Sequence, residues 1–301
     1  MRIVAGGNIL VDKVMKKYGV PDWVKPYVYA YIKSNPLNAV KRGISFIDVK
    51  RKRGRITGNV IELPNSVQFE VSDVARIVGL FYAGEEESSR IAESWSKDLH
   101  DYDSKRYAEH FAALSEIEQK HLRAIRNMLE GLGKKFGSES PEVKALFGKL
   151  GTITDWKERI ISYDLVIKSS YGSTFGNIFY KVFYPVMPEY MRSFGKAFSS
   201  ENAEASWGYE EAKRIIKEGE IGTQRLVYLF NELLPLVGEI INANMSIADK
   251  AGISKEVSLL RDIAIAYPVY IAKECGADIN AEKETAAILE TLKSRNKPAK
   301  E

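Results

Sequence analysis

The stretch "SEIEQKHLRAI" (residues 115–125) sets two ionisable side chains, Glu118 and His121, into an apolar helical pattern. Residues of this pattern recur every three or four positions, which is typical of one buried face of a helix. They are Tyr107, Phe111, Leu114, Glu118, His121, Ile125, Met128 and Leu132. Burying a carboxylate and an imidazole is costly unless each is paired. The stretch therefore predicts a long helix over residues 104–131 whose inner face carries either a salt bridge or a metal ligand set.

The remaining sequence predicts a mainly α protein with a small α/β arm. Helices are expected over 72–99, 155–184, 187–218 and 222–250, with a short helix in the link after residue 133 and further helices near the C-terminus. Two strands, 44–50 and 56–63, are expected to pair across a basic turn, and "VQFEV" is a candidate third strand. We expect a basic arm over 1–68, a helical bundle over 69–275, and a C-terminal helix with a flexible tail over 276–301.

Composition limits the function classes. The 301 residues are 45% hydrophobic and 28% charged, as in a globular protein. The single cysteine, Cys275, excludes an internal disulfide, a cysteine zinc site and an iron–sulfur cluster. No apolar run is long enough to span a membrane, and no secretion signal is visible, so a cytoplasmic location is expected. The abundance of Lys, Arg and Glu is typical of heat-adapted proteins.

The motif Glu118-x-x-His121, on a long helix that follows an acid-bearing helix, resembles the ferritin-like superfamily of carboxylate-bridged di-iron proteins, which includes ribonucleotide reductase small subunits and monooxygenases. The resemblance implies a long four-helix bundle. It also implies a metal ligand from the preceding helix. The apolar stripe of that helix favours Glu85, whereas the residue count to Glu118 favours Glu87, and both alternatives stay open.

The second half of the chain departs from the family pattern, because neither helix expected there contains a histidine. By position, Glu204 in "EASW" stands where the second Glu-x-x-His would begin, and Ser170 stands where another ligand is expected. Thr174 resembles the threonine near the oxygen pocket of family oxygenases. Gly172 and Gly176 in the same stretch fit a bulged helix or close packing. The resemblance thus implies metal ligands Glu85 or Glu87, Glu118, His121 and Glu204, with Ser170 and Thr174 lining an oxygen pocket.

These observations favour an iron- or manganese-dependent oxidoreductase or oxygenase with an incomplete di-metal site. The missing second histidine favours an alternative, a metal-free helical scaffold or binding subunit. Residues 1–60 carry a net charge of +10, from eight Lys and five Arg against three Asp, and the other 241 residues sum to −6. The basic cluster at residues 50–55 is Lys50, Arg51, Lys52, Arg53 and Arg55. It is expected to bind an anionic substrate or nucleic acid, or to dock on acidic surface of its own chain or a partner subunit, as in a homo-oligomer.

Overall fold

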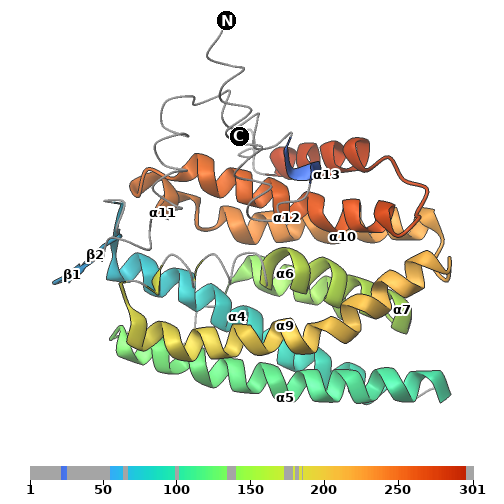
Figure 1. The fold of residues 1–301 in the computed structure, drawn as a ribbon, viewed down its shortest axis with the longest axis horizontal. Helices are drawn as coiled ribbons and strands as arrows, with labels where there is room; N and C mark the ends of the chain where they lie inside the picture. Colours follow the sequence, from blue (N-terminus) through green and yellow to red (C-terminus); the bar gives the residue numbers. More distant parts are fainter. Residues whose placement is uncertain are drawn as a thin grey trace, which may run out of the picture.

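The computed structural model describes residues 22–25, 55–63, 67–98, 102–133, 140–172, 179, 183–184 and 186–295. Within these ranges the protein is mainly α, with nine α-helices, one π-helix and a small antiparallel sheet (Figure 1). The elements are the 3₁₀ helix η1 (Asp22–Val24), β1 (Arg55–Thr57), β2 (Val60–Glu62), β3 (Gln68–Glu70), α4 (Val71–Ser96), α5 (Tyr102–Gly131), α6 (Pro141–Leu150), α7 (Trp156–Ile160), the π-helix η3 (Ile161–Gly172), α9 (Pro188–Lys217), α10 (Thr223–Asn242), α11 (Met245–Lys250), α12 (Ser254–Glu274) and α13 (Ala281–Arg295).

Helices α4 and α5 form a long antiparallel pair (Figure 1). The apolar pattern predicted for α5 is buried from Tyr107 to Met128, and Leu132 at its end is half-buried. The matching face of α4 is buried from Val74 to Trp95. Hydrogen bonds cross the pair where Ser89 Oγ lies 3.3 Å from Ser115 Oγ and accepts from Gln119 Nε2 at 3.0 Å. The 3.6-residue period therefore predicted both the helices and their inner faces correctly.

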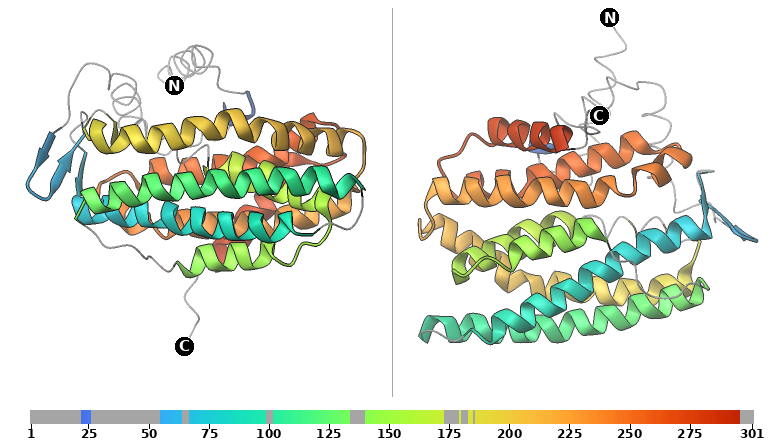
Figure 2. Two further views of the ribbon diagram at one scale, coloured as in Figure 1. Left: turned by 90° about the horizontal axis from the view of Figure 1, so that it is seen from below. Right: turned by 180° about the vertical axis from the view of Figure 1, so that it is seen from behind.

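The helices are arranged in layers (Figures 1 and 2). The α4–α5 pair and α9, which packs against α5, form one side, and α10, α12 and α13 form the other. Between them lie α6, α7 and η3, and η3 contacts α9, α10 and α12. Tyr163 of η3 is the largest fully buried side chain, and it packs against Trp95 of α4 with ring centroids 6.2 Å apart. The π-helix is thus central to the core.

The region predicted as one helix over 155–184 is built differently. The α-helical hydrogen bonding of α7 ends at Ile160, and the next twelve residues, Ile161–Gly172, form the π-helix η3. π-Helices of any length are rare and occur often at functional sites. The helix predicted over 222–250 is also interrupted, because α10 ends at Asn242 and α11 begins at Met245. None of the helices among the described residues has both the length and the hydropathy that crossing a membrane requires.

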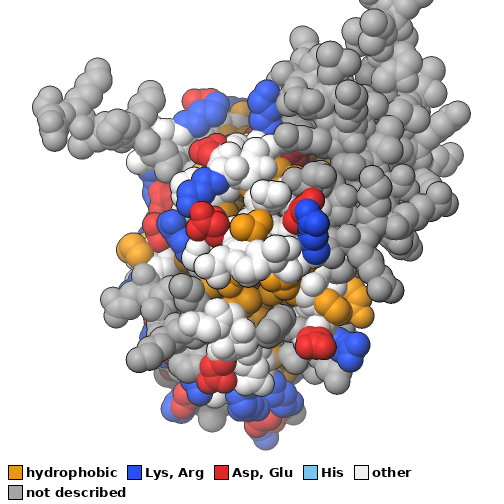
Figure 3. All heavy atoms as spheres, turned by 90° about the vertical axis from the view of Figure 1, so that its left-hand side faces the viewer, with side chains coloured by type: hydrophobic (Ala, Val, Ile, Leu, Met, Phe, Trp, Pro, Cys, Tyr) orange, Lys and Arg blue, Asp and Glu red, His pale blue; other side chains and the backbone are white. Residues whose placement is uncertain are grey.

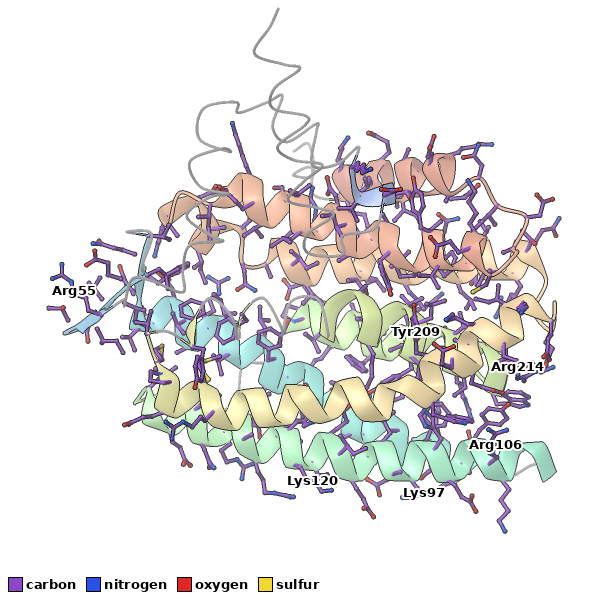
Figure 4. All side chains as sticks on the ribbon, viewed as in Figure 1. Arg55, Lys97, Arg106, Lys120, Tyr209 and Arg214 are labelled. Carbon is purple, nitrogen blue, oxygen red and sulfur yellow. The ribbon has the colours of Figure 1, made fainter. Side chains whose placement is uncertain are left out.

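The sheet differs from its prediction in one strand. The segment predicted as a single strand over 56–63 is a hairpin of β1 and β2, with Gly58 at a positive φ of 59° in the turn. The candidate third strand is β3, which pairs with β2 so that buried Ile61 and Phe69 are partners. The predicted strand 44–50 lies outside the described residues. The hairpin projects beyond the helices, carrying Arg55 outward (Figures 1 and 4), and positive and negative side chains are interspersed on that end of the molecule (Figure 3).

Candidate metal centre

Three buried side chains with metal-binding atoms meet between α4 and α5. Glu85 comes from α4, and Glu118 and His121 come from α5. Their ligand atoms all lie within 4.8 Å of one another. His121 Nδ1 is 2.9 Å from Glu118 Oε2 and 3.3 Å from Glu85 Oε2. The exposed fractions are 8% for Glu85 and 1% for the other two residues. These atoms form a compact oxygen–oxygen–nitrogen set that is shielded from water.

The local helical geometry explains how the three residues meet. Glu118 and His121 are three residues apart, so they lie one turn apart on the same face of α5. Glu85 occupies the corresponding inner stripe of the antiparallel helix, one turn before buried Ser88. Lys120, between Glu118 and His121, is exposed and points away from the other helices (Figure 4). Glu118 and His121 are therefore on the packed face of α5, and Lys120 is on its solvent-exposed face.

Two side chains of η3 complete the surroundings of Glu118. Tyr163 Oη donates a hydrogen bond of 2.8 Å to Glu118 Oε1. Lys168 Nζ lies 3.0 Å from the same oxygen in an ion pair whose side chains are 8% and 1% exposed. The Lys168 ammonium also lies 5.7 Å from the centre of the Tyr163 ring. The two oxygens of the Glu118 carboxylate thus have different environments, Oε2 facing His121 and Oε1 facing η3.

The π-helical geometry is what allows Tyr163 and Lys168 to reach one oxygen. In an α-helix, residues five apart point in directions roughly 140° apart. In a π-helix, each N–H bonds to the carbonyl five residues earlier, so residues five apart lie on successive turns of the same side. Both side chains consequently reach Glu118 Oε1. Neither residue was predicted to lie near Glu118, because α-helical spacing was assumed for this segment.

The buried charges shift one another's proton affinities. Burial and the neighbouring Glu118 carboxylate hold the pKa of Glu85 well above its ordinary value. Burial also acts to raise the pKa of Glu118, but the Lys168 ammonium and the hydrogen bonds from Glu85 and His121 lower it well below its ordinary value. Burial acts to lower the pKa of His121, yet its hydrogen bonds to Glu118 and Glu85 raise it to about 10. Without a metal, His121 is therefore a cation at neutral pH.

Tyr163 stays protonated in this environment. Burial and the nearby Glu118 carboxylate hold the pKa of its phenol well above the ordinary value. Its hydroxyl is therefore a permanent hydrogen-bond donor to Glu118 Oε1 at physiological pH. Such a donor fixes the orientation of the carboxylate, as groups that hydrogen-bond to metal-binding side chains commonly do.

The other predicted site residues have different positions. Glu87, the alternative to Glu85, forms an ion pair with Arg90 at 2.6 Å and is not in the buried group. Ser170 is fully buried, and its hydroxyl donates to the backbone carbonyl of Val166 within η3. The backbone of Glu204 belongs to α9, but its side chain is outside the described part of the structure. Thr174 also lies outside the described residues.

A second buried polar contact lies nearer the N-terminal end of α5. The His110 side chain is only 12% exposed, and its Nε2 lies 3.2 Å from Asp164 Oδ2 of η3. The His110 ring also packs on Trp207 of α9, with centroids 4.7 Å apart. The adjacent Gly208 leaves room for the Asp164 carboxyl, which an added Cβ would overlap. This contact joins α5, η3 and α9.

One turn further along α9, towards its C-terminal end, lies a network of ion pairs. Buried Glu211 accepts a 2.5 Å hydrogen bond from Tyr107 Oη and pairs with Arg214 at 2.8 Å. Arg214 also pairs with Glu218 and Glu220. This network involves no histidine, and its hydrogen bond from Tyr107 ties α5 to α9.

The basic cluster is mostly outside the described residues, which include only its last member. Arg55 of β1 pairs with Glu62 across the hairpin at 2.7 Å.

Comparison with models of known protein families, with curated proteins and with solved structures found no match to this chain. The described part of the chain is mainly helical and contains a buried Glu85–Glu118–His121 group that could hold a metal.

Proposed function

We propose that Glu85, Glu118 and His121 bind a divalent metal, iron or manganese, and that the protein is a metal-dependent oxidoreductase. The observation that carries this proposal is the convergence of two carboxylates and one imidazole within 4.8 Å in the helical core. Carboxylate and imidazole ligands together suit iron and manganese. A bound ion of either element supplies redox and Lewis-acid chemistry. The residues of the chain hold it in a dry environment in which charge interactions are strong.

The finer part of the proposal is a ferritin-like bundle and an oxygen-activating reaction. The antiparallel α4–α5 pair, the packing of α9 on α5 and the central position of η3 support the bundle. Glu204 of α9 would supply a further carboxylate, and Ser170 and Thr174 would line a pocket for dioxygen. The π-helix supports a functional role for this segment, because such helices are common at functional sites.

Metal content tests the proposal with a matched pair of variants. Glu85→Gln removes one ligand from the buried group, whereas Glu87→Gln makes the same change at the neighbouring residue that pairs with Arg90. After growth with iron and manganese, the wild type and Glu87→Gln should contain metal, and Glu85→Gln and His121→Ala should contain little. Metal below about 0.1 ion per wild-type chain, unchanged in all variants, would reject the metal-binding function.

A second candidate function is a metal-free scaffold or binding subunit. It is favoured by the presence of Lys168 in the site, because its ammonium and a protonated His121 supply positive charge beside the Glu118 carboxylate without a metal. In this function, the basic cluster at residues 50–55 would contact an acidic partner or nucleic acid. Neutralising these residues should then abolish retention on nucleic acid at low salt. Retention that does not change would exclude this class of partner.

A further inference from the structure

The two oxygens of Glu118 divide the site into two halves. On one side, Oε2 lies 2.9 Å from His121 Nδ1, and the Glu85 carboxylate completes this half. On the other side, Oε1 lies 3.0 Å from Lys168 Nζ and accepts the hydrogen bond of Tyr163. A carboxylate that lies between two cations can contact each of them with a different oxygen. Here one of the two cation positions is already taken by an ammonium that belongs to the chain.

We infer that the site takes a single divalent cation, on the Glu85–Glu118–His121 side, and that Lys168 is a built-in cation that fills the place of a second metal. The inference rests on the proposed metal site and specifies its stoichiometry. Lys168 acts through Glu118 and is a determinant of which ions the site accepts.

Charge arithmetic supports a single ion. With neutral His121 bound to a dication, the two carboxylates, the Lys168 ammonium and the metal sum to +1. A second dication would raise the sum to +3 in a group whose side chains are at most 10% exposed. Uncompensated charge of this size is prohibitive away from water. The second ion would also have to displace both Lys168 and Tyr163 from Oε1, and both are anchored on the π-helix in the core.

The wild-type protein provides the first test, with Mn²⁺ as the probe. Equilibrium dialysis at saturating Mn²⁺ should give one ion per chain at this site. Electron paramagnetic resonance should show the hyperfine pattern of an isolated ion. Two Mn²⁺ ions per chain with a spin-coupled spectrum would overturn the inference while leaving the metal-binding function intact. No bound Mn²⁺ in any form of the protein would overturn the metal-binding function itself and the inference with it.

Charge reversal tests the role of Lys168 directly. Lys168→Glu replaces the ammonium with a carboxylate beside Glu118 and should raise the capacity to two Mn²⁺ ions with a coupled spectrum. The matched control is Lys120→Glu, the same change on the exposed face of α5, two residues from Glu118 (Figure 4). The control should stay at one isolated ion. One ion in both variants, with a folded Lys168→Glu protein by circular dichroism, would overturn the inference.

A neutral variant tests the role of the Lys168 charge if Lys168→Glu does not fold. Lys168→Met keeps a long flexible side chain and removes the charge, which suits a buried position. Removing a buried positive charge beside the metal should tighten binding of the first Mn²⁺ about tenfold or more. An affinity equal to or weaker than that of the wild type would show that Lys168 does not oppose cation binding and would overturn the inference.

Discussion

Lys168 and Glu118 form an ion pair of 3.0 Å in which both side chains are buried. The pair joins the π-helix η3 to α5 at the point where Glu118 also contacts His121. A buried ion pair contributes little net stability, because desolvation offsets the attraction, but loss of one partner is strongly destabilising. Substitution of one of these two residues should therefore lower the free energy of unfolding measurably.

Removing the Glu118 charge should destabilise the metal-free protein. Glu118→Gln leaves the Lys168 and His121 cations without their main counter-ion, and we expect the free energy of unfolding to fall by about 3–5 kcal/mol. Urea denaturation followed by circular dichroism measures this change. Glu116→Gln, on the exposed side of the same helix, serves as the control and should change the stability by less than about 0.5 kcal/mol. Equal effects of the two substitutions would contradict the buried charge cluster.

The stability of the metal-free protein should decrease as the pH rises above neutrality. Folding raises the pKa of His121 from its ordinary value of about 6.5 to about 10, so the folded state binds this proton more tightly. The stabilisation is complete below about pH 6.5 and is lost as the pH approaches about 10. The slope should approach about 1.4 kcal/mol per pH unit within this window. Urea titrations at several pH values measure it, and His121→Gln should give a flatter profile.

Metal binding should release protons at neutral pH. His121 must be neutral to bind a metal, although its pKa of about 10 keeps it protonated in the metal-free protein. Glu85, whose pKa is also raised, contributes a further proton to the extent that it is protonated. Calorimetry of Mn²⁺ binding in two buffers with different ionisation enthalpies counts these protons. We expect at least one per metal at pH 7, and apparent affinity that rises with pH. Binding without proton release would mean that His121 is not a ligand.

Gly208 should be intolerant of a side chain. A Cβ at this position would overlap the Asp164 carboxyl, which would have to move away from His110. We expect Gly208→Ala to cost about 1–3 kcal/mol in the free energy of unfolding. Gly148→Ala is the matched control, since Gly148 is also helical but has nothing within 4 Å of an added Cβ. The control should stabilise the protein by about 0.5–1 kcal/mol. A neutral Gly208→Ala variant would contradict the close packing of α9 on η3.

Most of the candidate metal group could be predicted from helical periodicity. The spacing of α5 placed Glu118 and His121 on its buried face, and the structure confirms this placement. The apolar stripe of α4 favoured Glu85, and Glu85 is the acidic residue that joins the group. The residue count that favoured Glu87 rested on a family resemblance, and this residue pairs with Arg90. The physical pattern was the better guide because burial follows the local helix geometry.

The other half of the environment could not be predicted with α-helical spacing. Tyr163 and Lys168 reach Glu118 together only because η3 has π-helical hydrogen bonds. No single residue type in the segment predicts this geometry. Gly172, where η3 ends, and Gly176 were compatible with either a bulged helix or close packing. The β1–β2 hairpin was missed for a different reason. Its strands have three residues each, too few to show alternation, so that the turn at Gly58 was read as part of one strand.

Anomalous X-ray diffraction from crystals soaked in Mn²⁺ would locate any metal bound to Glu85, Glu118 and His121. We expect one anomalous peak per chain between α4 and α5, within about 2.0–2.3 Å of oxygens of Glu85 and Glu118 and of His121 Nδ1. Lys168 should remain beside the other oxygen of Glu118. A Mn²⁺-soaked crystal with no peak there, and with His121 still hydrogen-bonded to both carboxylates, would contradict this expectation.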